Sequence, residues 1–201
     1  TPSGVTFSTD GTNMYVCGLA NEGIVQYTLS TAFKVTTAVY VRFFDVSGYT
    51  SKPQGIVFSP DGAKMYFVED SGDSVLQWAL STAWDISTCS YVAQFYVSSQ
   101  ETESRGLAFN NDFTKMYVVG ISGDDVNEYA LSTAFLISTA TYTTNMAVPQ
   151  DIETVDVTFN LDGTVIYILG ASSDSVIPYN LSTAFDISTG TVDASNMFYI
   201  Y

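Results

Sequence analysis

The stretch "PQGIVFSPDGAKMYFVED" (Pro53–Asp70) has the pattern of a β-hairpin. Two apolar segments flank an Asp-Gly pair, and glycine adopts without steric cost the positive φ that a tight turn requires. The pattern recurs along the chain, because Phe58 has counterparts at Phe7, Phe109 and Phe159, at spacings of 51, 51 and 50 residues. Four copies of one unit therefore account for the chain.

Each unit continues with two more strand-like segments, which in the first copy are "GIVQYTL" (23–29) and "YVRFFDVS" (40–47). Val, Ile, Thr, Tyr and Phe dominate these segments, as they do in β-strands. Two positions depart from the pattern. Phe113 replaces the turn glycine of the third copy, and because phenylalanine is strained at positive φ we expect a different turn there. Pro178 in the fourth copy lacks a backbone donor, which predicts a β-bulge or a place without two-sided pairing.

A nine-residue segment of the type "LSTAFDIST" (181–189) joins the third and fourth strands of every unit. Its Ser and Thr hydroxyls suit the amides of a turn. A large aromatic side chain stands in the middle of this polar turn, and we expect it to pack against its own or the adjacent unit as a folding staple. A ligand-binding aromatic is the alternative. The four residues are Phe33, Trp84, Phe135 and Phe185.

Four-stranded antiparallel units with a period near 50 residues predict an all-β fold, a four-bladed β-propeller with four antiparallel strands per blade. Residues 1–201 would form a single domain, with blades at approximately 1–50, 51–101, 102–152 and 153–201. Each blade is one contiguous unit, so we expect no terminal strand exchange between the first and last blade. We expect the fourth blade to meet the first by side-chain packing in a closed monomeric ring. A dimeric eight-bladed ring, or a window cut from a longer array, is the alternative.

Composition argues against several classes of function. The net charge of −15, from 21 acidic and 6 basic residues, disfavours nucleic acid and anionic membrane surfaces as partners. No apolar run is long enough to span a bilayer, so we expect no membrane insertion. The chain has no histidine, which removes the usual Ser-His and Cys-His nucleophile pairs. Cys17 and Cys89 fall at different places in the repeat and predict no disulfide.

Acidic residues gather in the loops that a propeller places on one face. One interpretation is turn geometry. The other is a site for Ca²⁺, which carboxylate oxygens suit, or for cationic or hydroxylated ligands at the channel mouth. The mouth is expected just ahead of each first strand, at Ser3, Gln54, Arg105 and Val155. We assign no catalytic residue and no metal ligand. The candidate binding residues are Tyr49, Gln54, Asp70, Asp73, Glu101, Glu103, Arg105, Asp124, Asp125, Asp151, Glu153 and Asp174.

The stretches at Pro53–Asp70 and "PSGVTFSTDGTNMYV" (Pro2–Val16) resemble the YVTN-type β-propeller repeats, whose motif runs Pro-x-Gly, apolar strand, Ser-Pro-Asp-Gly, Tyr-Val. The third copy departs from the motif at Ser104 and Phe113, and the fourth where Thr154 and Asp156 replace Pro and Gly. The LSTAFDIST-type segments resemble repeats of phage tail-fibre and bacterial surface proteins. The resemblance implies a propeller and an extracellular or virion-surface location, and it carries over no catalytic residue.

These observations predict a non-enzymatic binding or adhesion module of a fibre or surface protein. Its ligand would be a glycan or another cell-surface molecule, bound by hydroxyl-rich loops and aromatics such as Tyr49. One alternative is a structural spacer or assembly subunit without a ligand. Another is a carboxylate-based glycoside hydrolase or lyase, although nothing in the sequence pairs two carboxylates at a set distance.

Overall fold

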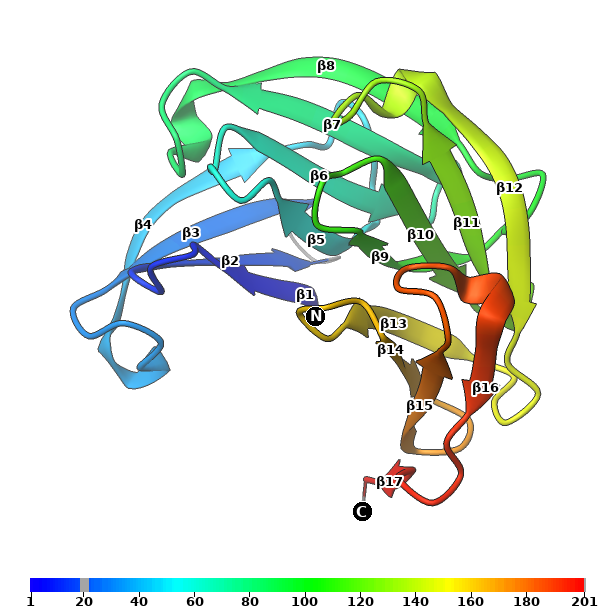
Figure 1. Ribbon diagram of the computed structural model, residues 1–201. Coiled ribbons are helices and arrows are strands. Elements are labelled where there is room, and N and C mark those ends of the chain that lie inside the picture. Colours follow the sequence, from blue (N-terminus) through cyan, green and yellow to red (C-terminus); the bar gives the residue numbers. More distant parts are fainter. Residues whose placement is uncertain (19–21, 201) are drawn as a thin grey trace.

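Four antiparallel sheets follow one another along the chain in the computed structural model, which describes residues 1–18 and 22–200 (Figure 1). Each sheet runs from an inner first strand to an outer fourth strand, and a three-residue 3₁₀ helix precedes the fourth strand. The prediction of an all-β, four-bladed β-propeller without exchange of terminal strands is confirmed. No helix in the described part of the chain is long and apolar enough to cross a membrane.

The elements of each blade occupy corresponding places in the four repeats. The first blade contains β1 (Pro2–Phe7), β2 (Asn13–Gly18), β3 (Gly23–Leu29), η1 (Val35–Thr37) and β4 (Ala38–Asp45). The second contains β5 (Pro53–Phe58), β6 (Lys64–Glu69), β7 (Ser74–Leu80), η2 (Ile86–Thr88) and β8 (Cys89–Tyr96). The third contains β9 (Ser104–Phe109), β10 (Lys115–Gly120), β11 (Asp125–Leu131), η3 (Ile137–Thr139) and β12 (Ala140–Ala147). The fourth contains β13 (Thr154–Phe159), β14 (Val165–Gly170), β15 (Ser175–Leu181), η4 (Ile187–Thr189), β16 (Gly190–Val192) and β17 (Phe198–Tyr199).

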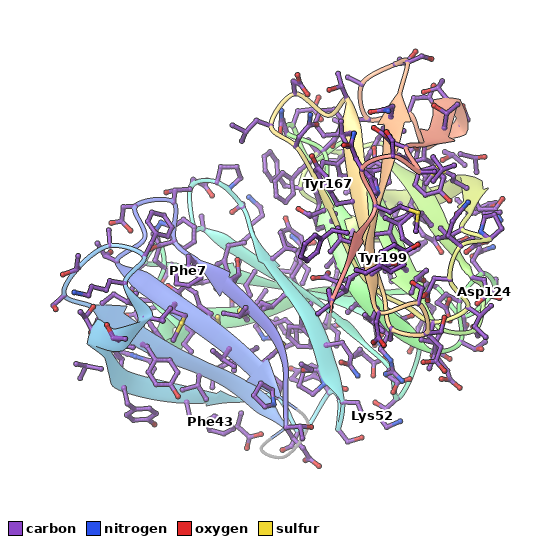
Figure 2. All side chains as sticks on the ribbon, turned by 90° about the horizontal axis from the view of Figure 1, so that it is seen from below. Phe7, Phe43, Lys52, Asp124, Tyr167 and Tyr199 are labelled. Carbon is purple, nitrogen blue, oxygen red and sulfur yellow. The ribbon has the colours of Figure 1, made fainter. Side chains whose placement is uncertain are left out.

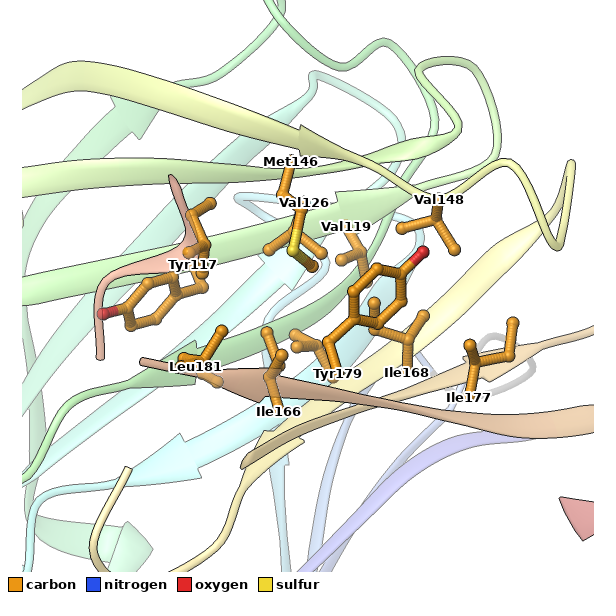
Figure 3. Packing of buried hydrophobic residues seen from close by; sticks show 13 residues of the cluster. Tyr117, Val119, Val126, Met146, Val148, Ile166, Ile168, Ile177, Tyr179 and Leu181 are labelled. Atoms are coloured by element: carbon orange, nitrogen blue, oxygen red, sulfur yellow. The ribbon is translucent and has the colours of Figure 1, made fainter. Parts of the chain in front are cut away.

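Apolar side chains fill the space between consecutive blades. Between the third and fourth blades, Tyr117, Val119 and Val126 pack against Ile166 and Ile168, and all five are fully buried (Figure 3). Equivalent clusters join the first blade to the second and the second to the third. The hydrophobic core is therefore three joints between sheets, each made from the two facing sides of neighbouring blades.

In the second, third and fourth blades, the aromatic residue of the LSTAFDIST-type segment packs against its own and the preceding blade, as expected of a folding staple. The Trp84 ring lies 5.3 Å from the ring of Phe58 in its own blade and 6.4 Å from that of Tyr15 in the preceding blade. The Tyr15 hydroxyl donates a 2.5 Å hydrogen bond to the Trp84 carbonyl oxygen. Because this acceptor belongs to the backbone, the joint needs the loop conformation as well as the ring. The same bond joins Tyr66 to Phe135 at 2.9 Å and Tyr117 to Phe185 at 2.6 Å.

The prediction of a different turn at Phe113 is wrong. Phe113 has φ 55°, close to the 70° of Gly11 and Gly62, and its amide donates to the Asn110 carbonyl as the glycine amides do to theirs. Its ring stacks 4.7 Å from the ring of Phe135, and the residue is only 4% exposed. Burial of a phenylalanine contributes about 2–3 kcal/mol, which offsets the roughly 1–2 kcal/mol cost of a left-handed backbone.

The prediction for Pro178 is confirmed. The residue lies in β15, where the outer strand of the fourth blade is divided into β16 and β17. The Pro178 carbonyl accepts a bond from the amide of Asp193, which lies in the turn between those two short strands. Cys17 and Cys89 are both free, in agreement with the absence of a predicted disulfide.

The arc of blades does not return to its start, and this corrects the expected closed ring. Inner strands pack in the order β1, β5, β9 and β13, and no comparable packing joins β13 to β1 among the described residues. One face of the first blade and one face of the fourth are left without a neighbouring sheet (Figure 1). Val5 on β1 is 59% exposed, whereas its counterpart Ile56 is 6% exposed. Among residues 1–18 and 22–200, the fourth and first blades therefore share no joint like those between consecutive blades.

Candidate functional site

A cavity of about 510 Å³ lies on the axis of the propeller and is lined by the inner strands of all four blades. Neighbouring inner strands can lie this close together because Gly4, Gly55 and Gly106 have no side chains. A Cβ added at Gly55 would lie 3.0 Å from the Arg105 carbonyl oxygen, and one at Gly106 would lie 2.7 Å from the Cα of Asp156. The polar side chains that line the cavity belong to Ser3, Lys52, Gln54, Asp70, Arg105 and Asp156.

Asp156 is the departure from the repeat that gives this cavity a carboxylate. It occupies the place that Gly4, Gly55 and Gly106 hold in the other blades. Its Oδ1 accepts a 2.9 Å bond from the Val157 amide, which orients the group. The side chain is open to the cavity, yet the protein around it limits its hydration, and this desolvation raises the pKa of Asp156 above the ordinary aspartate value.

Arg105 and Lys52 bring positive charge to the same cavity. The Asp70 Oδ2 atom lies 2.6 Å from the Arg105 Nη1 atom and 3.0 Å from the Lys52 Nζ atom. Burial alone would raise the pKa of Asp70, but the hydrogen bonds from Arg105 and Lys52 outweigh it and hold this pKa below the usual range. Asp70 therefore remains ionised and fixes the direction of the guanidinium group, which has five donors and cannot lose its charge.

Three of the predicted binding residues, Gln54, Asp70 and Arg105, come together in this cavity. Three polar cavity residues were missing from the candidate binding residues, namely Lys52, Asp156 and Ser3, and Ser3 had been expected only at the channel mouth. The sequence contained a signal for Asp156, because it breaks the repeat at an invariant glycine of the other copies. Nothing in the sequence singled out Lys52 except its place directly before β5, the inner strand of the second blade.

Several other predicted binding residues hold the loops together. The buried Glu101 carboxylate accepts bonds from the amides of Glu103, Ser122 and Gly123, and Asp151 does the same for Glu153 and Ser173. Such buried acceptors satisfy amides that would otherwise be left without partners. Turn geometry therefore explains better than ligand binding why Glu101 and Asp151 occur in these loops, and neither residue lines the cavity.

The remaining candidates also lie outside the cavity lining. Asp73, Asp124 and Asp174 adopt positive φ values of 50°, 51° and 47° in tight turns, and the buried Asp125 accepts bonds from Asn127 and Asn145. The Tyr49 ring stacks 4.8 Å from the ring of Tyr91 on the outer strand β8, so it belongs to the outer rim. Glu103 and Glu153 are exposed. Within residues 1–18 and 22–200, no three acidic, Cys or His residues are grouped so as to hold a metal ion, Ca²⁺ included.

Comparisons with known proteins support the fold. No protein-family model matches the chain, and no curated protein matches its sequence. A solved structure assigned as a 6-phosphogluconolactonase from Bacteroides uniformis is similar, with a TM-score of 0.67 and 12% identity over 99% of this chain and 55% of that chain. One with the same assignment from Bacteroides fragilis has a TM-score of 0.66 at 14% identity, over 99% of this chain and 55% of that one. The periplasmic gluconolactonase of Pseudomonas aeruginosa has a TM-score of 0.61 at 16% identity, over 95% of this chain and 52% of that one.

These likenesses correct the prediction of a non-enzymatic adhesion module, because the proteins compared are named as lactonases. The expectation that the chain is not an enzyme is corrected by the same finding. At 12–16% identity the likeness establishes the fold. The chain spans about half the length of the proteins it matches, and the activity of a whole protein of that kind is a matter for proposal.

Proposed function

We propose that the axial cavity is the active site of a hydrolase that opens a small, sugar-derived lactone. Asp156 would act as the general base and Arg105 would bind the oxygen on which negative charge develops. The observation that carries the proposal is a carboxylate with a raised pKa, Asp156, in the same cavity as a guanidinium group that Asp70 holds in place. The names of the structural neighbours add support at the level of reaction class.

The proposed reaction uses one water molecule. Ionised Asp156 accepts a proton from the water while the water oxygen attacks the lactone carbonyl carbon. The carbonyl oxygen becomes an oxyanion, which the guanidinium of Arg105 stabilises. Collapse of this intermediate breaks the bond between the carbonyl carbon and the ring oxygen. The ring oxygen takes the proton back from Asp156, and the product is an open-chain hydroxy acid.

The elevated pKa of Asp156 suits this role. A base becomes stronger as its pKa approaches the working pH, and desolvation moves the Asp156 pKa in that direction. Lys52 supplies a second positive charge, which would favour a substrate or product bearing a carboxylate or phosphate group. Both cations stand out in a chain with only 6 Lys and Arg residues against 21 acids.

The carboxylate arrangement disfavours glycoside hydrolysis at this site. That chemistry needs a second carboxyl group that acts as nucleophile, base or proton donor. The other carboxylate of the cavity, Asp70, is engaged by both Lys52 and Arg105, and its pKa is lowered. It would neither donate a proton readily nor leave its two cationic partners.

Hydrolysis of glucono-δ-lactone, followed by the protons released in weak buffer, tests the proposal. Wild-type protein should exceed the spontaneous rate, and Asp156→Asn should lose about 10²–10⁴-fold in kcat, the usual contribution of a general base. Glu153→Gln is the matched control, because Glu153 is an exposed acid three residues away and outside the cavity. Equal rates for wild type and Asp156→Asn, or no activity above the spontaneous rate with this and phosphorylated lactones, would refute the proposal.

A further inference from the structure

The open faces of the first and fourth blades are the two halves of a joint that occurs three times inside the chain. We infer that they bind each other between two copies of the chain, so that two chains close one eight-bladed ring. Figure 2 looks at the molecule from below, with Phe7 on the first blade and Tyr167 and Tyr199 on the fourth.

The open face of the first blade repeats the face that the second blade buries. Phe33 and Val35 are 60% and 56% exposed, and they correspond to the staple Trp84 and to Ile86, which is fully buried. The difference arises because Trp84 packs against the first blade, whereas no blade within residues 1–18 and 22–200 covers Phe33. Other apolar residues of this face are Val5, Phe7, Val16, Val25, Tyr27 and Tyr40.

The open face of the fourth blade repeats the opposite half of the joint. Tyr167 is 37% exposed, whereas its counterparts Tyr15, Tyr66 and Tyr117 are fully buried. Ile200 is 48% exposed, and its amide donates to the Asp174 carbonyl just as that of the fully buried Val148 donates to Asp124. Phe198 is 67% exposed next to it. Leu169 and Val176 complete the face at places where Val119 and Val126 are buried.

The two faces match in hydrogen bonding as well as in apolar character. Each internal joint contains a bond from a tyrosine hydroxyl to the carbonyl of the next staple residue. Tyr167 has the donor of this pair and Phe33 has the acceptor, and no such bond joins them among the residues that the structure describes. In the ring of two chains, Tyr167 of one copy donates to the Phe33 carbonyl of the other, at both junctions.

The number of blades agrees with a second copy. The 201 residues cover 52–55% of the length of the similar structures compared above, so a ring of that size has room for about as many blades again. Two copies make eight blades, which lies within the usual range of four to eight. The contact is head-to-tail, and a twofold rotation about the propeller axis closes it without leaving a free face.

Asp156 sets the spacing at the junction. Inside the chain, a Cβ at the equivalent glycines would approach the next inner strand within 2.7–3.1 Å. Asp156 has a Cβ, so the inner strands of two copies must stay slightly further apart than those within a chain.

Light scattering on a sizing column tests the inference with the 201-residue chain. We expect a mass near twice 21.8 kDa. Tyr167→Arg on one face and Val5→Arg on the other should each weaken self-association at least tenfold. Leu161→Arg, in a hairpin turn at 94% exposure, should leave it unchanged. Thermal melting establishes that each variant is folded, and Phe198→Arg replaces Tyr167→Arg if that variant is not.

Mixing the two interface variants provides a sharper test. Each retains one intact face, so a head-to-tail contact predicts that the mixture forms a heterodimer although neither variant associates alone. Dimerisation of either single variant would indicate contact between identical faces and would overturn the inference. A monomer at all concentrations, or open oligomers larger than a dimer, would overturn it equally. Asp156→Asn should dimerise like the wild type, which separates this inference from the proposed activity.

Discussion

Truncation of the staple in the third blade, Phe135→Ala, tests how the joints between blades are stabilised. The Phe135 ring stacks 4.7 Å from the ring of Phe113, and the Lys64 Nζ atom lies 5.0 Å from its centroid. A fully buried phenylalanine costs about 3–5 kcal/mol when truncated to alanine. Because Phe135 is only partly buried, we expect about 2–3 kcal/mol.

For a chain of this size, each kcal/mol lowers Tm by about 2–4 °C, so the expected decrease is about 4–12 °C. The Phe135 carbonyl that accepts bonds from Tyr66 and Gln77 remains in the variant, and the measurement therefore isolates the ring. Calorimetry and urea unfolding are the assays. Tyr96→Ala is the control, because this aromatic residue is 64% exposed and should cost less than about 1 kcal/mol. Equal losses in the two variants would refute the staple.

Three further predictions concern the turn, a loop acid and the cavity. Phe113→Gly relieves a positive φ but removes a buried ring, so urea unfolding should show a net loss of about 1 kcal/mol; a gain in stability would contradict this balance. Glu101→Ala leaves three loop amides without their acceptor and should cost about 3 kcal/mol, measured in the same way; a loss under about 0.5 kcal/mol would show that the loop does not need the carboxylate. Desolvation disfavours the ionised form of Asp156 in the folded protein. The free energy of unfolding therefore decreases as pH rises through the raised pKa of Asp156 in the folded state. Asp156→Asn should therefore raise Tm at pH 7, and the gain should vanish below the ordinary aspartate pKa of 3.8; a Tm difference independent of pH would argue against desolvation.

The repeat made most of the fold predictable. Hairpins, strand order and the staples follow from local pattern, since each copy states the same apolar positions and the same turn chemistry. The turn at Phe113 could not be predicted from local propensity. Its positive φ is tolerated because Phe109 and Phe135 stack on its ring, and those contacts depend on the tertiary arrangement.

Closure and the site were less accessible from sequence. The repeats predict that each blade has two apolar faces that pack against neighbouring blades. Whether four blades complete a ring depends on the angle between neighbouring blades, which the repeats do not specify. The acids were assigned by their place in loops, and this could not separate buried loop acceptors such as Glu101 from cavity groups such as Asp70. The most informative signal was a broken repeat, where aspartate stands at position 156 in place of glycine.

The bond from a tyrosine hydroxyl to the carbonyl of the next staple has an evolutionary consequence. Each unit of about fifty residues encodes its own donor and its own acceptor, for example Tyr66 and the Trp84 carbonyl in the second unit. A tandem duplication of the coding segment therefore yields a unit that already fits both of its neighbours, with no compensating mutation. Unequal crossing-over could lengthen or shorten such a gene one blade at a time, while the substitutions that create a new pocket accumulate in single copies.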